Sequence, residues 1–433
     1  LLEWTTAQDA ERKARADLPG LFRTMWAGPG GAVVAGALLA AFRLPALAAA
    51  APVLVLWLLG PLLAWYISRP ARLRPVVLAE DEIRYLRRMA RKTWRFFETF
   101  VGPGDHWLPP DNYQEHPVSA IAHRTSPTNM GLSLTANLAA YDLGYITSTR
   151  LLQRTTNALE TMELLPRFQG HFFNWYDTRS LQPLHPLYIS SVDSGNLVGH
   201  LHVVRLGVSG VPDDPILPRQ WREGLQDLLS EILLRLDAQE NGTAPMNRPG
   251  TRRFASRVAS FEEALRGPTS SMPETAALLR RLVRESEAAA ATLTPESDNE
   301  LRWSCRAFAR QCRDLVEHLR AAAPWLFLSA PSDETWETQP DTSSEALERW
   351  REFRAILDRS VSLRDIAGLA ETFLPSIGIS LESTAFRHKE GHQWLVQLRQ
   401  AVVSGARRAR RLMAEAEETA RRCERLSRIE YGF

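Results

Sequence analysis

The sequence predicts an all-α protein in which a membrane-spanning helical hairpin precedes a large helical domain. An uncharged apolar run is long enough to cross a bilayer, and residues 80–433 repeat their apolar side chains at the three- and four-residue spacings of helices. Little of this region shows the period-two alternation of half-exposed strands. The 433 residues, 45% hydrophobic and 24% charged, suffice for two or three folded domains.

The apolar run covers residues 44–67 and holds no charged side chain over 24 residues. A bilayer core requires roughly 20. A shorter Gly-rich apolar stretch, residues 27–42, precedes it, and Arg43 and Pro45 separate the two as a turn would. The positive-inside rule places both outer ends in the cytoplasm, because both carry basic residues: Arg12, Lys13, Arg15, Arg23, Arg69, Arg72 and Arg74. The alternative is a buried helical hairpin of a soluble protein.

After the hairpin, the apolar spacing predicts an amphipathic first helix that begins near residue 80 and reaches Val101. Four more follow: from Pro127 to near Gly144, over residues 149–165, from residues 193–195 to Leu206, and over residues 217–236. Ser126 is a typical N-cap with proline at the first helical position. Glycine or proline ends the helices at Gly144, Pro166 and Gly207.

Connection lengths indicate where a binding site belongs. About 25 residues separate the first and second helices, and about 28 separate the third and fourth, whereas the other links are short. If successive helices are antiparallel, the two long loops emerge at the same end of the bundle. Long loops gathered at one end of a helical scaffold are where a binding site is expected.

The chain divides, by these patterns, into a cytoplasmic linker (1–26), the transmembrane hairpin (27–68), the first part of the helical domain (80–236), a helical insertion (237–345) and further helices of the same domain (346–433). Helices are expected near 272–293 and 298–322. The basic Ala/Arg/Glu-rich pattern of 387–429 is typical of a solvated helix face. Because the chain begins with Leu1 and ends without an obvious last element, we expect it to be part of a longer protein.

The composition argues against several classes of protein. The 52 basic and 50 acidic side chains leave a net charge of +2, so nucleic acid is not an expected partner. The three cysteines contain no CxxC pair, which favours free thiols over a zinc site or a disulfide framework. His200 and His202 lie two apart on a helix and therefore point in different directions, so no metal site is expected. Phosphate-binding glycine loops, HExxH, GxSxG and DxD motifs are missing.

The first long loop contains HWLPPDNYQEH (106–116) followed by AHRTSPTN (122–129). It combines amides, carboxylates and a guanidinium group with aromatic rings, which is the mixture that binds sugars: polar groups for the hydroxyls and a flat ring for the apolar sugar face. Helix capping explains Ser126 and Pro127. The candidate binding residues here are Trp107, Asp111, Asn112, Arg124 and Asn129.

The second long loop contains GHFFNWYDT (170–178) and YISSVDSGN (188–196), which are denser in aromatic and polar groups than an ordinary linker. Its candidate binding residues are Asn174, Trp175, Tyr176, Asp177, Asp193 and Asn196. Asp193 has an alternative explanation, since an aspartate at the start of a helix serves as its N-cap.

At these motifs the sequence resembles the central region of bacterial cyclic β-1,2-glucan synthases. The resemblance rests on ISRPARLRP (67–75), TWRFFETFV, GDHWLPPDNYQE, AHRTSPTNMGL, GHFFNWYDTRSLQPL and SSVDSGNLVGHL. It is extensive over residues 1 to about 207 and weaker beyond 210.

This resemblance implies a large enzyme of the bacterial inner membrane with its soluble part in the cytoplasm. A transferase part uses UDP-glucose as donor to extend a β-1,2-glucan, a central domain cyclises the glucan by transglycosylation, and a phosphorylase-like region adjusts its length. The central domain is implied to be an (α/α)6 toroid that needs no cofactor in this segment. The implied partners are β-1,2-glucan, the lipid bilayer and other domains of the same polypeptide.

In such families a carboxylate pair flanks the scissile bond as acid and nucleophile. The resemblance places that pair beyond Phe433, so we expect this segment alone to be inactive, and its catalytic residues are unknown. Asp177 and Asp193 are the fallback candidates. The alternative function is a membrane-tethered helical carbohydrate-binding or scaffold module without catalysis of its own.

Overall fold

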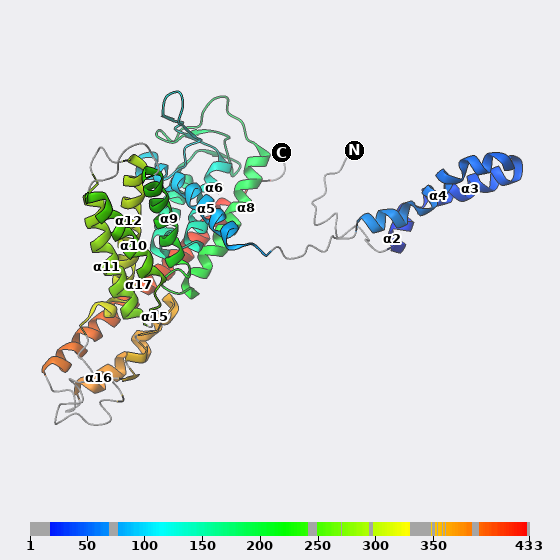
Figure 1. Cartoon of the computed structure of the whole chain (residues 1–433). Helices are drawn as coiled ribbons and strands as arrows, with labels where there is room; N and C mark the ends of the chain where they lie inside the picture. Colours follow the sequence, from blue (N-terminus) through cyan, green and yellow to red (C-terminus); the bar gives the residue numbers. More distant parts are fainter. Residues whose placement is uncertain are drawn as a thin grey trace. The chain divides into compact units, whose positions relative to one another are not determined.

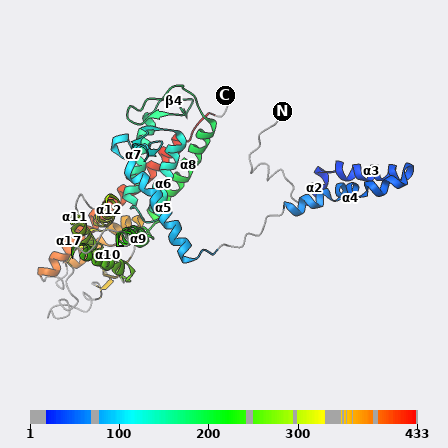
Figure 2. The same cartoon turned by 45° about the horizontal axis from the view of Figure 1, so that its top comes forward.

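The structure, a computed structural model, confirms the all-α fold class (Figures 1 and 2). It describes residues 18–68, 77–240, 249–269, 271–293, 298–329, 348, 351–352, 354–356, 358–359, 361–382 and 389–430. The chain forms two compact units, Leu1–Ala79 and Glu80–Phe433.

The first unit contains α2 (Leu18–Thr24), α3 (Ala27–Phe42) and α4 (Leu44–Ile67). Arg43 alone separates α3 from α4, and the two helices pack side by side as a hairpin (Figure 1). By length and composition α4 is suited to cross a membrane, and α2 with α3, bent by 66° between them, would form a second span if counted as one. Most side chains of α4 are exposed, which in water would leave a large apolar surface.

The second unit is built mainly from helices. They are α5 (Glu80–Phe100), α6 (Pro127–Asp142), α7 (Ser148–Leu164), α8 (Ser191–Gly210), α9 (Trp221–Glu240), α10 (Pro249–Arg266), α11 (Met272–Ala291), α12 (Asn299–Ala322), α15 (Leu363–Thr372), α16 (Leu374–Glu382) and α17 (Lys389–Leu426). Short 3-10 turns occur at η1 (Pro103–Asp105), η2 (Val211–Asp213) and η3 (Pro324–Phe327).

Local sequence explains the start of α6 and corrects the predicted limits of α8. Ser126 Oγ accepts a hydrogen bond from Asn129 N at 3.2 Å, as an N-cap does. The prediction for α8 was wrong at both ends. Its N-cap is Ser190, whose Oγ accepts from Asp193 N at 3.2 Å, and the helix continues through Gly207. A Cβ at Gly207 would lie 2.5 Å from Leu138, so this glycine permits helix packing and does not end the helix.

A large hydrophobic core runs through the second unit, and a smaller cluster of Trp94, Ala140 and Tyr145 is separate from it. The helix α17, orange to red in Figures 1 and 2, packs against α7, α8, α12 and α15. Phe254 of α10, Leu279 of α11 and Phe308 of α12 are buried in the same cluster as Leu159 of α7 and Leu398 of α17. The helices within residues 237–345 therefore contribute to the shared core. The toroidal arrangement stays a prediction.

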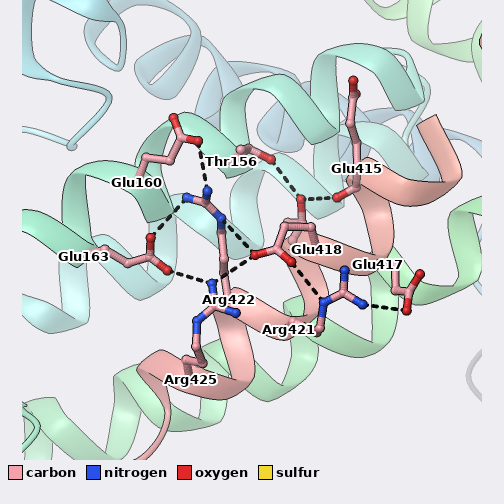
Figure 3. Close-up of polar contacts among 10 residues, drawn as sticks. Thr156, Glu160, Glu163, Glu415, Glu417, Glu418, Arg421, Arg422 and Arg425 are labelled. Carbon is pink, nitrogen blue, oxygen red and sulfur yellow. Dashed lines mark hydrogen bonds and ion pairs between the residues drawn. The ribbon is translucent and has the colours of Figure 1, made fainter. Parts of the chain in front are cut away.

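Ion pairs fasten the C-terminal half of α17 to α7 (Figure 3). Arg422, with a side chain only 19% exposed, lies 3.2 Å from Glu160 and 3.1 Å from Glu163. Beside them Thr156 and Thr419 share a hydrogen bond of 2.8 Å between their hydroxyls. The solvated face predicted for this basic run is thus interrupted by contacts that hold two helices together.

Candidate functional site

The two long loops meet at one end of the second unit, as predicted from their lengths. The strand β3 (Arg124–Thr125) pairs antiparallel with β6 (Tyr176–Asp177), so a segment of each loop lies against the other. Two further ribbons, β1 (Tyr113–Gln114) with β2 (Ala120–Ile121) and β4 (Arg167–Phe168) with β5 (His171–Phe172), lie within the loops. Figure 2 shows β4 at the top of this unit. The helices α6 and α8 follow the loops directly and pack against each other.

At this junction, side chains of the two loops and of the N-terminal turns of α6 and α8 form what we call the loop cluster: Asp111, Arg124, Thr128, Asn129, Asn174, Trp175, Asp193 and Asn196. Apart from Thr128, all of its members are candidates from the sequence.

Arg124 forms the first half of the loop cluster. Its Nε and Nη2 donate to Asp111 Oδ2 at 3.2 and 3.0 Å, and its guanidinium carbon lies 5.0 Å from the ring centroid of Trp175. Asp111 also accepts from Asn112 Nδ2 at 3.0 Å and from Asn129 Nδ2 at 3.3 Å. A carboxylate from the first loop is thereby connected to an aromatic ring from the second.

Asp193 forms the second half of the loop cluster. Its Oδ1 accepts from Thr128 Oγ1 at 2.6 Å, and Asn196 Nδ2 donates to the same hydroxyl at 3.3 Å. With the Asn174 amide oriented to satisfy its neighbours, Nδ2 donates to Asp193 Oδ2 at 3.0 Å and Oδ1 accepts from Trp175 Nε1 at 2.7 Å. Asp193 lies in the first turn of α8, where the helix dipole stabilises a negative charge.

Trp175 belongs to both halves, because its ring contacts Arg124 and its Nε1 donates to Asn174. Tyr188, an exposed residue that the sequence did not single out, donates from Oη to Asn174 Oδ1 at 2.6 Å. The indole is therefore held in one orientation from two sides.

Two candidates of the second loop hold the loop's own structure. Tyr176 is fully buried; its Oη donates to Pro166 O at 2.7 Å and accepts from Phe173 N at 2.8 Å, and burial raises its pKa to about 12. Asp177 Oδ1 accepts from Ser180 N at 2.7 Å and from Arg179 N at 3.0 Å, which closes a turn. The hydrogen bonds from Ser180, followed by those from Arg179, lower the pKa of Asp177.

Trp107, the remaining aromatic candidate of the first loop, contacts the helices. Its ring lies 5.7 Å from the guanidinium carbon of Arg154 on α7 and packs partly against the core. It is one of the non-glycine residues with a positive φ, 63°, directly after His106 at 52°.

A second tie between the loops was not predicted. Asp105 Oδ1 accepts from Thr178 Oγ1 at 2.6 Å and lies 2.7 Å from His123 Nδ1. Burial would raise the pKa of Asp105, but the hydrogen bonds from Thr178 and His123 outweigh it and lower the pKa. Although both GDHW and AHRT were among the motifs, nothing in the local sequence pairs an aspartate with a histidine of another segment.

The loop cluster combines an aromatic ring with several hydrogen-bonding side chains. It presents a partly exposed indole beside amide, hydroxyl and guanidinium groups, the pattern that recognises pyranose rings. Both oxygens of Asp111 and of Asp193 accept hydrogen bonds, so each carboxyl group orients the side chains around it. Among the described residues, no group of three or more His, Cys, Asp or Glu side chains gathers closely enough to hold a metal ion.

None of the family models matches the chain. A 270-residue segment, 61% of the chain, is 36% identical to the cyclic β-(1,2)-glucan synthase NdvB of Rhizobium meliloti (strain 1021). The match covers 9% of that protein, so the chain spans a small part of the length of its relative. The resemblance to cyclic β-1,2-glucan synthases that the loop motifs indicated is thereby confirmed.

Proposed function

We propose that this chain is part of a membrane-bound cyclic β-1,2-glucan synthase and that the loop cluster binds the β-1,2-glucan chain while it is cyclised by retaining transglycosylation. The similarity to NdvB supports the role in cyclic glucan synthesis. The main observation in favour of a sugar site is the position of Trp175 at the junction of the two loops. Arg124, about fifty residues earlier in the sequence, and Asn174 hold its indole in place.

The physical argument for glucan binding is preorganisation. A fixed indole offers a flat apolar surface for the C–H face of a glucose ring, and the amides and guanidinium beside it donate to the hydroxyls. Because these side chains already bond one another, little side-chain entropy is lost when the sugar binds.

The catalytic carboxylate pair is proposed to lie outside the loop cluster, in other parts of the synthase. A retaining enzyme needs one carboxyl group with a raised pKa as general acid and a second as nucleophile. Asp177 closes a turn with a lowered pKa, and both oxygens of Asp193 are occupied by Thr128 and Asn174. The isolated chain is therefore expected to bind glucan without converting it, and UDP-glucose is expected to serve only the transferase part of the whole protein.

The hairpin of α3 and α4 is proposed to anchor the protein in the bacterial inner membrane, with residues 80–433 in the cytoplasm. The exposed apolar surface of α4 supports the membrane anchor. The basic Arg23 at one outer end supports a cytoplasmic position for that end. The other flanking basic residues, Arg12, Lys13, Arg15, Arg69, Arg72 and Arg74, lie outside the described residues.

Single cysteines test the hairpin. The native Cys305, Cys312 and Cys423 are buried, and burial raises the pKa of each thiol, so they provide a low background for labelling. Arg23→Cys and Val77→Cys should both react with an impermeant reagent added from the cytoplasmic side of membrane vesicles, and Arg43→Cys from the other side. Labelling of positions 23 and 77 from opposite sides would overturn the hairpin.

The glucan proposal is tested with the full chain in detergent micelles. Isothermal titration with linear β-1,2-glucan should show binding, while β-1,3-glucan of equal length should bind much more weakly. Analysis of the products after incubation with β-1,2-glucan then shows whether the chain only binds the glucan or also converts it. Binding without new products supports the proposal. Cyclic product would place the catalytic carboxylates within this chain, and equal binding of both glucans would contradict the assigned substrate.

A further inference from the structure

A pocket of about 220 Å³ lies among α5, α7 and α12, apart from the loop cluster. Charged side chains from all three helices line it: Glu98 of α5, Arg150 and Arg154 of α7, and Arg310 and Asp314 of α12. Aromatic rings, including those of Trp94 and Trp107, complete its wall. The proposed glucan site assigns no role to these groups.

Both carboxylates of this pocket already have guanidinium partners. Glu98 accepts from Arg91 Nη2 at 2.8 Å through Oε2 and from Arg310 Nη2 at 2.7 Å through Oε1. Asp314 accepts from Arg150 at 3.1 Å and 2.8 Å, through one oxygen each. Their negative charges are therefore already paired with arginines other than Arg154.

Arg154, unlike Arg150 and Arg310, has no carboxylate as a hydrogen-bond acceptor among the described residues. Its Nε donates to Asn137 Oδ1 at 3.0 Å and its Nη2 to Phe97 O at 2.9 Å, both neutral oxygens. Its guanidinium carbon lies 5.0 Å from the ring centroid of Trp94 and 5.7 Å from that of Trp107. Within the described part of the chain, no carboxylate forms an ion pair with Arg154, although the charge of Glu98 is near enough to act on it.

The charges around the pocket consequently do not cancel. Three guanidinium groups line it against two carboxylates, and Arg91 behind Glu98 adds a further positive charge. The neighbouring Asp227 does not compensate, because it pairs with Arg87 at 2.9 Å. A half-buried cation without a carboxylate partner is costly, and burial lowers the pKa of Arg154 to about 10.

We propose that this pocket binds a small oxyanion of the size of inorganic phosphate, with Arg154 as its main cationic partner. Guanidinium groups match the oxygens of a phosphate with paired, charge-assisted hydrogen bonds. The rings of Trp94 and Trp107 make part of the pocket wall apolar, which strengthens the attraction there. A neutral sugar of similar volume would leave the charge of Arg154 uncompensated.

The test titrates inorganic phosphate into the full chain in detergent micelles at constant ionic strength, followed by calorimetry and by the thermal midpoint of unfolding. The wild type should bind one phosphate and unfold at a higher temperature, whereas chloride at equal ionic strength should have no such effect. Arg154→Gln should weaken phosphate binding by roughly tenfold or more, since the hydrogen-bonded charge is lost.

Two further variants make the test specific. Arg306→Gln removes the same charge from an exposed position on α12, one turn before Arg310, and should bind phosphate like the wild type. Gln153→Glu adds a carboxylate to the exposed edge of the pocket wall and should weaken binding even if Arg154→Gln does not fold.

The proposal is overturned if the wild type binds no phosphate, or if Arg154→Gln and Gln153→Glu bind it as tightly as Arg306→Gln does. Binding of glucose in place of phosphate would likewise overturn the assignment of an oxyanion.

Discussion

Arg124 connects Asp111 to Trp175: its Nη2 donates to Asp111 Oδ2 at 3.0 Å, and its guanidinium carbon lies 5.0 Å from the ring centroid of Trp175. The Arg124 side chain is 52% exposed, so solvent screens this ion pair and it adds little to the stability of the fold. Its main effect is to hold groups from two loops at fixed positions. A mutation of Arg124 is therefore expected to weaken glucan binding and to change the free energy of unfolding very little.

Arg124→Lys should weaken binding of linear β-1,2-glucan by roughly tenfold, because lysine supplies neither the paired hydrogen bonds nor the planar contact with the indole. The free energy of unfolding should change by less than about 1 kcal/mol. Calorimetry and urea denaturation measure the two quantities. Arg179→Lys, the same exchange at an exposed position of the second loop, is the control and should bind normally. Normal binding by Arg124→Lys would remove this arginine from the site.

Asp193→Ala should lower the free energy of unfolding by about 1–3 kcal/mol, because the hydroxyl of Thr128 and the amide of Asn174 both lose their acceptor. Urea denaturation followed by circular dichroism measures the loss. Val192→Ala shortens an exposed neighbour in the same helical turn and should have little effect. Equal stability of the two variants would show that Asp193 does not support the junction of the loops.

Gly144→Ala should destabilise the second unit by at least about 3 kcal/mol or prevent folding. Gly144 has φ of 78°, and a Cβ there would lie 2.0 Å from Gln220 O, part of the backbone before α9. Gly199→Ala in α8 is the matched control, since nothing lies within 4 Å of its added Cβ. That change should stabilise the helix by about 0.5–1 kcal/mol. A well-folded Gly144→Ala protein would contradict the close approach of the two backbones.

The imidazole of His318 should make stability depend on pH. Burial lowers its pKa from 6.5 to about 4, even though its hydrogen bond to Ile216 O opposes the shift. The unfolded chain therefore binds a proton at a higher pH than the folded chain. This contribution to stability is fully present above pH 6.5 and is lost as pH falls toward 4, with a magnitude on the order of 3 kcal/mol.

His318→Gln tests that dependence, because glutamine can bond to Thr149 and Ile216 but does not titrate. In denaturation series between pH 4.5 and 7.5, the free energy of unfolding should depend less steeply on pH for His318→Gln than for the wild type. His202→Gln, an exposed change on α8, should leave this pH dependence unaltered. Equal slopes for wild type and His318→Gln would assign the acid sensitivity to other groups.

Helix boundaries followed from the sequence where local chemistry determines them. Ser126 with Pro127 begins α6, and α7 ends just before Pro166, because capping and proline geometry act within a few residues. The limits of α8 did not follow. Ser190 lies three residues before the expected cap, and the glycine at position 207 packs against Leu138, a contact that exists only after α6 and α8 meet.

The candidate site was predicted in part. The sequence indicated that the two long loops would meet, because long connections at one end of a bundle must lie near one another. It could not separate exposed from buried members of the same motif: Trp175 and Tyr176 are adjacent, yet one belongs to the loop cluster and the other lies in the core. The tie between Asp105 and His123 depends on tertiary packing and left no local pattern.

The central claim, a glucan site built around Trp175, is tested most directly by titrating linear β-1,2-glucan into the wild type, Trp175→Ala and Phe168→Ala. Phe168 is an exposed ring on β4 outside the loop cluster, so its removal controls for the loss of aromatic surface. We expect Trp175→Ala to lose about 1–3 kcal/mol of binding free energy, as buried aromatic anchors do, and Phe168→Ala to bind like the wild type. Equal affinity of all three proteins would contradict the account.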